Sequence, residues 1–357
     1  MHHTYIAEDL LSMFSNMRYD AHPMSIFISA FAAMGAYAPE ANPSLRGEDL
    51  YIRDKEIMNK QIIRIIGKAA TVAAAAYRIR IGRPFNQPRS DLGYTENMLY
   101  MMDHMNEDLS YRPDPRLSKA LDILFLLHAD HEMNCSTATM THVGSSLVDP
   151  YSAIAASAAA LNGFRHGGAN EAVVRMLEKI GVAKNVPAFI EKVKRKEALL
   201  FGFGHRIYRE TDPRSKVIRE VADMVFDAVG SKEPLIDVAL TLRDAALRDD
   251  FFVKRRLYPN VDFFSGLIYK ACGFPSDFFP VLFAVPRVVG YLAHWKQLLD
   301  SDSNKIWRPR QLYVGAGERA YLSVDERPER QIKNSKEGLV DLPHYMSKRR
   351  LTRPSKL

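Results

Sequence analysis

The sequence predicts an all-α protein in which helices pack on helices. Apolar residues recur at helical spacing through most of the 357 residues, and few stretches alternate strictly between apolar and polar residues. Hydrophobic residues make up 47% and charged residues 25% of the chain, which is typical of a globular protein with a sizeable core. At roughly 150 residues per domain, the length favours two domains.

Taken in order, the first helix is expected where Ile6, Leu10 and Phe14 repeat at helical spacing. A second helix is expected after His22-Pro23, up to about residue 36. A third covers 55–81, where isoleucines precede a run of alanines. These small side chains predict close approach to another helix.

A recurring helix-start signal is Asp followed by Pro. It occurs at Asp114, Asp149 and Asp212. Aspartate at the N-cap accepts a backbone N–H, and proline at the first helical position loses no hydrogen bond. Further helices are expected near 170–180, 187–198, 213–229, 234–248, 263–272 and 277–297.

Composition excludes several classes of protein. The two cysteines, Cys135 and Cys272, form no CxxC motif, so a disulfide framework or a zinc-thiolate site is not expected. No strictly apolar run reaches the roughly 18 residues of a membrane span, so no membrane partner is expected. Residues 342–357 contain five Lys and Arg and no acid, so this tail carries five of the seven net charges. Nucleic-acid binding would instead need a basic face on a folded domain, so no nucleic-acid partner is expected.

The chain ends in Ser355-Lys356-Leu357. A terminal Ser-Lys-Leu is a peroxisomal address that an import receptor reads. We therefore expect a peroxisomal or glyoxysomal location.

Two histidines, His128 and His131, follow a strongly apolar helix. Their i, i+3 spacing would put them on one helical face, but no HExxH motif or cysteine supports a metal site. The alternative is a pair of histidines at a helix C-terminus, where the dipole favours positive charge.

Two glycine-rich segments also contain histidine. His166 precedes Gly167-Gly168, where a ligand can approach bare backbone and a helix N-terminus would keep the imidazole neutral; an ordinary interhelix loop is the alternative. His205 follows Gly202 and Gly204, but a lone GxG with no preceding strand is no dinucleotide fingerprint.

One aspartate and several arginines complete the candidate set. Asp262 lies among aromatic residues, where desolvation would raise its pKa as a general base requires, although locally it reads as a helix N-cap. Arginines pair bidentately with carboxylates, although a single arginine is more often a surface ion-pair partner. The candidates are Arg209, Arg214, Arg287, Arg308 and Arg310.

Together and in order, five of these segments resemble the citrate synthase family. They are HADHExN around His131, HGGANE at His166, GFGHR followed by DPR at His205, PNVDFFSG at Asp262, and RPRQLY from Arg308. Five separated motifs in one order are far more specific than any one of them.

The resemblance implies a mostly helical, two-domain homodimer. The large domain would comprise 1–167 and 274–330, the small mobile domain 168–273, and a basic tail 331–357. These limits fall at Gly167-Gly168 and near Gly273, which suits a hinge.

The resemblance also implies a reaction, the condensation of acetyl-CoA with oxaloacetate and the hydrolysis of citryl-CoA, without a metal or a permanently bound cofactor. His166 would stabilise the enol, Asp262 would remove the methyl proton, and His205 would polarise the keto group. Oxaloacetate would be bound by His131, Arg214, Arg287 and Arg308, the last from the other subunit, and coenzyme A by Arg209 and Arg255.

Two alternatives to this function remain open. A 2-methylcitrate synthase would use propionyl-CoA, and one methylene changes binding by only about 1–3 kcal/mol. Because the family has a longer N-terminal region, the second alternative is a truncated, catalytically silent subunit that pairs with a full-length partner.

Overall fold

The computed structural model describes residues 3–105, 110–204, 208, 212–230, 234–302, 304–315 and 317–326. The chain forms two units, Met1–Ile306 and Trp307–Leu357. Across the described residues the regular elements are helices, and β pairing is limited to an isolated antiparallel bridge between Phe203 and Pro259. The all-α prediction is confirmed.

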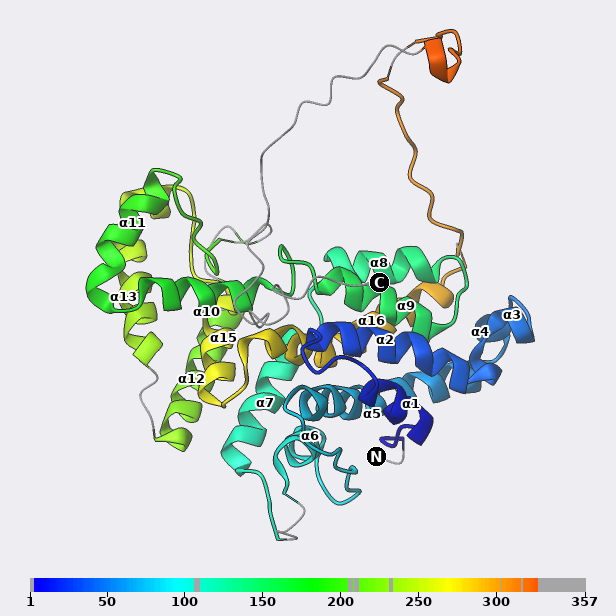
Figure 1. Cartoon of the computed structure of the whole chain (residues 1–357), viewed down its shortest axis with the longest axis horizontal. Helices are drawn as coiled ribbons and strands as arrows, with labels where there is room; N and C mark the ends of the chain where they lie inside the picture. The colour runs from blue at the N-terminus through cyan, green and yellow to red at the C-terminus, as the bar shows by residue number, and fades with distance from the viewer. Residues whose placement is uncertain are drawn as a thin grey trace. The chain divides into compact units, whose positions relative to one another are not determined.

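The α-helices of the described residues all lie in the first unit (Figure 1). They are α1 Glu8–Ser15, α2 Pro23–Met34, α3 Pro43–Arg46, α4 Leu50–Arg53, α5 Lys55–Arg80, α6 Tyr94–Asp103, α7 Pro115–His128, α8 Cys135–Gly144, α9 Pro150–Leu161, α10 Ala169–Ile180, α11 Val186–Lys194, α12 Arg214–Val229, α13 Pro234–Arg248, α14 Asp250–Lys254, α15 Val261–Ala271 and α16 Phe279–Leu299. Short 3-10 helices cover Gly35–Tyr37, Pro39–Ala41, Ala183–Asn185 and Ser276–Phe278.

The Asp-Pro signals mark helix starts, with one change. Asp114 accepts the Arg116 N–H at 2.8 Å to cap α7, and Asp149 accepts the Ser152 N–H at 3.0 Å to cap α9. At the third signal the helix begins one residue later than expected. Pro213 is the N-cap of α12, and Asp212 instead binds both the backbone and the side chain of Arg214.

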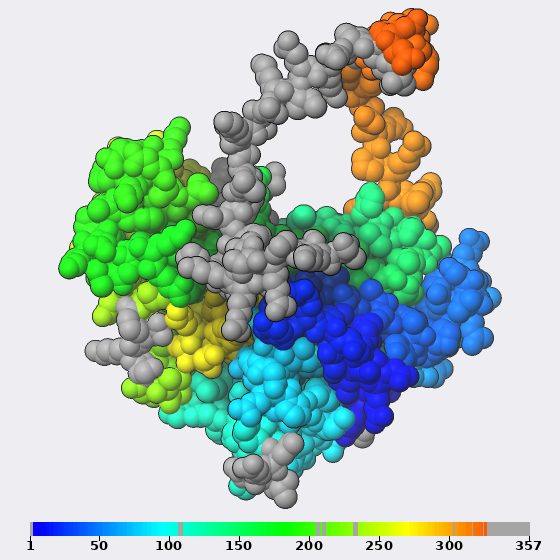
Figure 2. Space-filling view, viewed as in Figure 1, coloured from blue at the N-terminus to red at the C-terminus, as the bar shows by residue number. Residues whose placement is uncertain are grey.

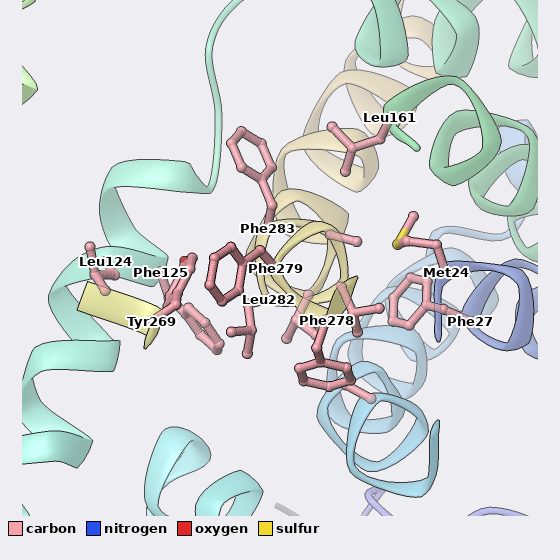
Figure 3. Packing of buried hydrophobic residues seen from close by; sticks show 14 of the residues in the cluster. Met24, Phe27, Leu124, Phe125, Leu161, Tyr269, Phe278, Phe279, Leu282 and Phe283 are labelled. Atoms are coloured by element: carbon pink, nitrogen blue, oxygen red, sulfur yellow. The ribbon is translucent and has the colours of Figure 1, made fainter. Parts of the chain in front are cut away.

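Helix α16 lies at the centre of the first unit and contacts α2, α5, α7, α8 and α9. Ser276–Leu299 is long and apolar enough to cross a membrane by length and composition, but 83% of its apolar window is buried inside the protein, so it is a core helix. The search for an uninterrupted apolar run did not detect this helix, because Arg287 and His294 interrupt its apolar residues. Figure 3 shows apolar side chains of α16 between those of α2 on one side and those of α7 and α15 on the other.

The alanines of α5 allow the close packing that the sequence predicted. Ala69, Ala70 and Ala73 to Ala76 are all buried, and α5 packs on α2, α6 and α16.

Burying a large apolar side chain contributes about 1.5–3 kcal/mol. Trp295 of α16 is fully buried, with its ring edge-on to Tyr51 at 4.9 Å between centroids.

Helices α10 to α15 pack chiefly on one another, with α10 and α12 both against α15 and α11 against α13. In Figures 1 and 2 the residues of α10 to α13 gather on one side of the first unit. This group also contacts the rest of the unit, because α12 packs on α7 and α10 packs on α16.

The second unit begins with residues 307–314, which form no regular secondary structure. It includes one 3-10 turn, Val324–Glu326, where Ser323 donates its hydroxyl to the Glu326 carboxylate at 2.8 Å. Several large apolar side chains of this segment are exposed, including Leu312 and Val314.

Candidate active site

The turn between α7 and α8 carries the first pair of histidines. His128 ends α7 and is fully buried, and its Nδ1 donates to the Leu124 carbonyl at 2.7 Å. Burial lowers the pKa of His128 to about 3, and the nearby Arg214 and Arg287 lower it too. The ring is therefore neutral, and the prediction of a cation at this helix end is wrong for His128.

His131 lies beyond the end of α7 rather than on its face. Its Nε2 is 3.1 Å from the hydroxyl of Tyr208, and the two rings meet edge to face. Among the described residues, no group of three or more His, Cys, Asp or Glu side chains is arranged to hold a metal ion.

His166 precedes α10, but its ring contacts the N-terminus of a different helix, α8. The Ser136 backbone N–H donates to Nε2 at 3.3 Å, and the Ser136 hydroxyl is 2.8 Å from the same atom. Nε2 is also 3.2 Å from Oδ1 of Asn134. The Ser136 N–H can only donate, so this contact favours the tautomer in which Nε2 accepts and the ring proton is on Nδ1. Burial, together with the nearby Arg287 and His131, lowers the pKa of His166 to about 4. The imidazole is neutral, as the sequence predicted, but α8 rather than α10 faces it.

Gly167, directly after this histidine, is required by packing. A Cβ at Gly167 would lie 2.6 Å from the Leu161 carbonyl oxygen. The loop can therefore fold tightly onto the end of α9 only with glycine at this position, which fixes the backbone on which His166 is mounted.

Asp262 lies in the first turn of α15. The N-cap of this helix is Asn260, whose side chain accepts the Asp262 N–H at 3.0 Å, so the N-cap reading of Asp262 is wrong. Burial raises the pKa of Asp262 to about 6, and Asp212 raises it too, whereas Arg214 and Arg287 lower it. The carboxylate is thus a stronger base than an exposed aspartate.

The turn before Asp262 is held by backbone hydrogen bonds to residues 202–204. Asn260 N–H donates to the Gly202 carbonyl at 2.9 Å, and Gly204 N–H donates to the Tyr258 carbonyl at 2.7 Å. Gly202 and Gly204 have φ values of 77° and 78°, which favour glycine. These bonds place the residues just before His205 beside the Asp262 turn; His205 itself lies outside the described residues.

Two arginines bring positive charge to the same place. Arg214 forms a two-point ion pair with Asp212, with its Nη2 2.8 Å from the carboxylate. Arg287 is 1% exposed, donates its Nε to the His128 carbonyl at 2.7 Å and stacks over Phe283 at 4.8 Å. Its Nη1 is buried and has no hydrogen-bond partner among the described residues. A buried donor without a partner is costly unless a ligand satisfies it.

The electrostatic links connect these groups into one site. Arg287 acts on the pKa of both His166 and Asp262, His131 acts on His166, and Arg214 acts on Asp262. The first unit therefore places two histidines, a desolvated carboxylate and two guanidinium groups from distant parts of the sequence within electrostatic range of their neighbours in this set.

The remaining predicted residues are four arginines. Arg209 lies outside the described residues, and Arg308 and Arg310 are exposed in the second unit. Arg255 is exposed, with its guanidinium 3.8 Å above the Phe251 ring.

Sequence reasoning missed Ser136 and Tyr208 as contacts of the two site histidines. Tyr208 stands among the charged residues after His205, and Ser136 follows a helix N-cap, so local patterns gave no signal of these distant contacts.

Comparison with known proteins identifies the family. The family described as "Citrate synthase, C-terminal domain" matches residues 1–310. A peroxisomal citrate synthase of Dictyostelium discoideum is 55% identical over 94% of this chain and 67% of its own length. A glyoxysomal citrate synthase of Cucurbita maxima is 54% identical over 91% of this chain and 62% of its own length.

The chain belongs to the citrate synthase family. A solved citrate synthase of Thermoplasma acidophilum, in ternary complex with carboxymethyl coenzyme A and oxaloacetate, has a TM-score of 0.81 and 27% identity, covering 91% of this chain and 81% of that one. The present chain spans about two thirds of the length of the curated relatives. Identity above 50% over nearly the whole chain makes citrate synthesis its activity.

Proposed function

We propose that His166, Asp262 and His205 perform the condensation of acetyl-CoA with oxaloacetate. The observation that carries this proposal is the contact between His166 Nε2 and the Ser136 N–H at 3.3 Å. In the tautomer that this contact favours, Nδ1 bears a proton that it can donate to the thioester oxygen. A positioned donor of this kind stabilises the developing enolate by about 2.7–4 kcal/mol.

Asp262 is the base that removes the methyl proton of acetyl-CoA. The methyl group beside a thioester is a weak carbon acid, so a carboxylate removes its proton only when the oxygen is stabilised at the same moment. A pKa of about 6 makes Asp262 a stronger base that is still ionised at neutral pH. His205 then polarises the keto group of oxaloacetate and protonates the forming hydroxyl, and water hydrolyses citryl-CoA.

Oxaloacetate is a dianion and is bound by His131, Arg214 and Arg287. The unpartnered, buried Nη1 of Arg287 supports this assignment, because a substrate carboxylate would satisfy it. Arg209 and Arg255 are proposed to bind the phosphates of coenzyme A. No metal or permanently bound cofactor takes part in these steps.

Arg308 is proposed to complete the oxaloacetate site of a second copy in a homodimer. The segment around it exposes apolar side chains, with Leu312 84% and Val314 86% exposed. Apolar surface of this kind is typical of a protein–protein interface. Sedimentation of the purified chain is expected to give twice the monomer mass; a monomer that is fully active would contradict this assembly.

Residues 168–273 are proposed to form a small domain that closes over the substrates. Helices α10 to α15, which lie within this range, pack chiefly on one another, as a domain would. Closure would exclude water from the enol and delay hydrolysis until the carbon–carbon bond has formed.

A thiol-release assay tests the reaction. We expect free coenzyme A from acetyl-CoA only when oxaloacetate is present, with a higher kcat/KM than for propionyl-CoA. A preference for propionyl-CoA would identify a 2-methylcitrate synthase. Citrate formation that appears only with a full-length partner would identify a catalytically silent subunit.

The named relatives are peroxisomal and glyoxysomal, and we propose the same location for this chain. Ser355-Lys356-Leu357, which lies outside the described residues, would bind the import receptor. A fluorescent protein fused to the N-terminus of the chain is expected in peroxisomes, and removal of the last three residues is expected to leave it in the cytosol. Import that survives this deletion would contradict the assignment.

A further inference from the structure

One face of α16 holds the turn that carries His131. Arg287, Gly290 and His294 are spaced three and four residues apart and so share this face. Arg287 donates to the His128 carbonyl at 2.7 Å. A Cβ at Gly290 would lie 2.2 Å from the Ala129 carbonyl oxygen, so the turn contacts the helix backbone directly.

The third contact on this face is a polar pair, Asp130 with His294. His294 Nε2 is 3.1 Å from Asp130 Oδ1. An ionised carboxylate only accepts hydrogen bonds, so the proton of this bond is on Nε2. The side chain of His294 is 20% exposed and that of Asp130 is 48% exposed, so water competes for the groups of this pair. The contribution of the pair is therefore geometric rather than a large gain in stability.

The other oxygen of Asp130 stabilises the turn itself. Oδ2 accepts the Glu132 N–H at 3.2 Å, and Glu132 has φ of 51°, an unfavourable conformation for a residue other than glycine. One carboxylate thus binds α16 through Oδ1 and the strained residue through Oδ2. His131 lies between Asp130 and Glu132 in the chain.

We propose that Asp130 and His294 are positioning residues for oxaloacetate binding. They fix the turn that carries His131 on the same helical face that carries Arg287. The distance between His131 and Arg287 is then fixed, so both side chains can bind the oxaloacetate dianion at the same time. This inference rests on the proposed oxaloacetate site, but neither residue touches the substrate.

Replacing His294 is the direct test. His294→Leu removes the donor and is expected to raise KM for oxaloacetate about five- to tenfold, with kcat changed less than twofold. His294→Gln keeps an amide N–H near the position of Nε2 and is expected to restore KM to within twofold of the original protein. The matched control is Lys296→Met, which removes an ion pair with Asp300 on the same helix and is expected to leave KM unchanged.

A double-mutant cycle separates positioning from general destabilisation. Asp130→Ala removes both contacts and is expected to raise KM at least as much as His294→Leu. The double variant is expected to match Asp130→Ala alone, because the two residues act through one bond. If His294→Leu does not fold, Asp130→Ala and His294→Gln still test the pair.

Three results would overturn the inference: an unchanged KM in His294→Leu, equal damage in His294→Gln and His294→Leu, or additive effects in the double variant. In each of these cases the original protein would still form citrate, so only the positioning role would be rejected. If the original protein formed no citrate, the proposed function would fail instead.

Discussion

Two turns of the molecule carry reacting or binding groups, and they are held in different ways. The turn from His128 to Asn134 is attached to α16 by a charged group, the Arg287 guanidinium, and by the hydrogen-bonded Asp130–His294 pair. The turn from Tyr258 to Asp262 is attached by neutral hydrogen bonds, most of them between backbone groups.

The difference follows from what each turn must do. Nearby cations increase the affinity of a turn that binds a dianion. They weaken a carboxylate base, because a cation lowers its pKa. Uncharged hydrogen bonds hold the turn that carries Asp262, so desolvation is the largest effect on the pKa of this carboxyl. The pKa rises to about 6 although Arg214 and Arg287 lower it.

The largest expected effect comes from removing the base. Asp262→Asn keeps the shape of the side chain but cannot accept the methyl proton, so kcat is expected to fall roughly 100- to 10,000-fold. Thiol release measures this. Asp250→Asn, an exposed aspartate paired with Lys254, is the control and is expected to be fully active. Near-normal turnover by Asp262→Asn would remove the reason for distinguishing the two turns.

The next effect tests the charged turn. Arg287→Lys keeps the charge but loses the planar, two-point geometry of guanidinium, so KM for oxaloacetate is expected to rise about tenfold or more. Arg116→Lys, at an exposed pair with Asp114, is the control and is expected to have no effect on KM. If KM were unchanged in Arg287→Lys, oxaloacetate would bind elsewhere.

A third variant tests the neutral turn through its glycines. Gly202 and Gly230 both have positive φ, but a Cβ at Gly202 would meet Val173 at 2.7 Å and Phe263 at 3.1 Å, whereas Gly230 has open space around it. Gly202→Ala is therefore expected to lower the free energy of unfolding by about 1–3 kcal/mol more than Gly230→Ala. Denaturant unfolding measures the difference, and equal losses would show that these contacts do not support the turn.

Local patterns in the sequence predicted much of the fold. The Asp-Pro pairs located the starts of α7 and α9, and the alanine run located the buried stretch of α5. Each of these signals depends on neighbours in the chain, so helix type and approximate limits could be read directly.

The site could be predicted only in part, because its contacts join distant residues. Ordered motifs indicated His166 and Asp262 as candidates. They did not show that Ser136 of another helix contacts the ring of His166, or that Asn260 takes the capping role expected of Asp262. The interpretation of His128 as a cation at a helix end was wrong because α15 and α16 bury its ring. These helices are far away in the sequence, so local patterns gave no signal of the burial.

The pKa of Asp262 tests the central claim most directly, namely that a neutral turn leaves this carboxylate desolvated and basic. Carbon-13 NMR of the aspartate carboxyl groups, with Asp262→Asn to assign the resonance, gives the midpoint in the free protein. We expect a midpoint near pH 6, with kcat/KM for acetyl-CoA falling tenfold per pH unit below it. A midpoint near 4, the ordinary value for aspartate, would contradict the account.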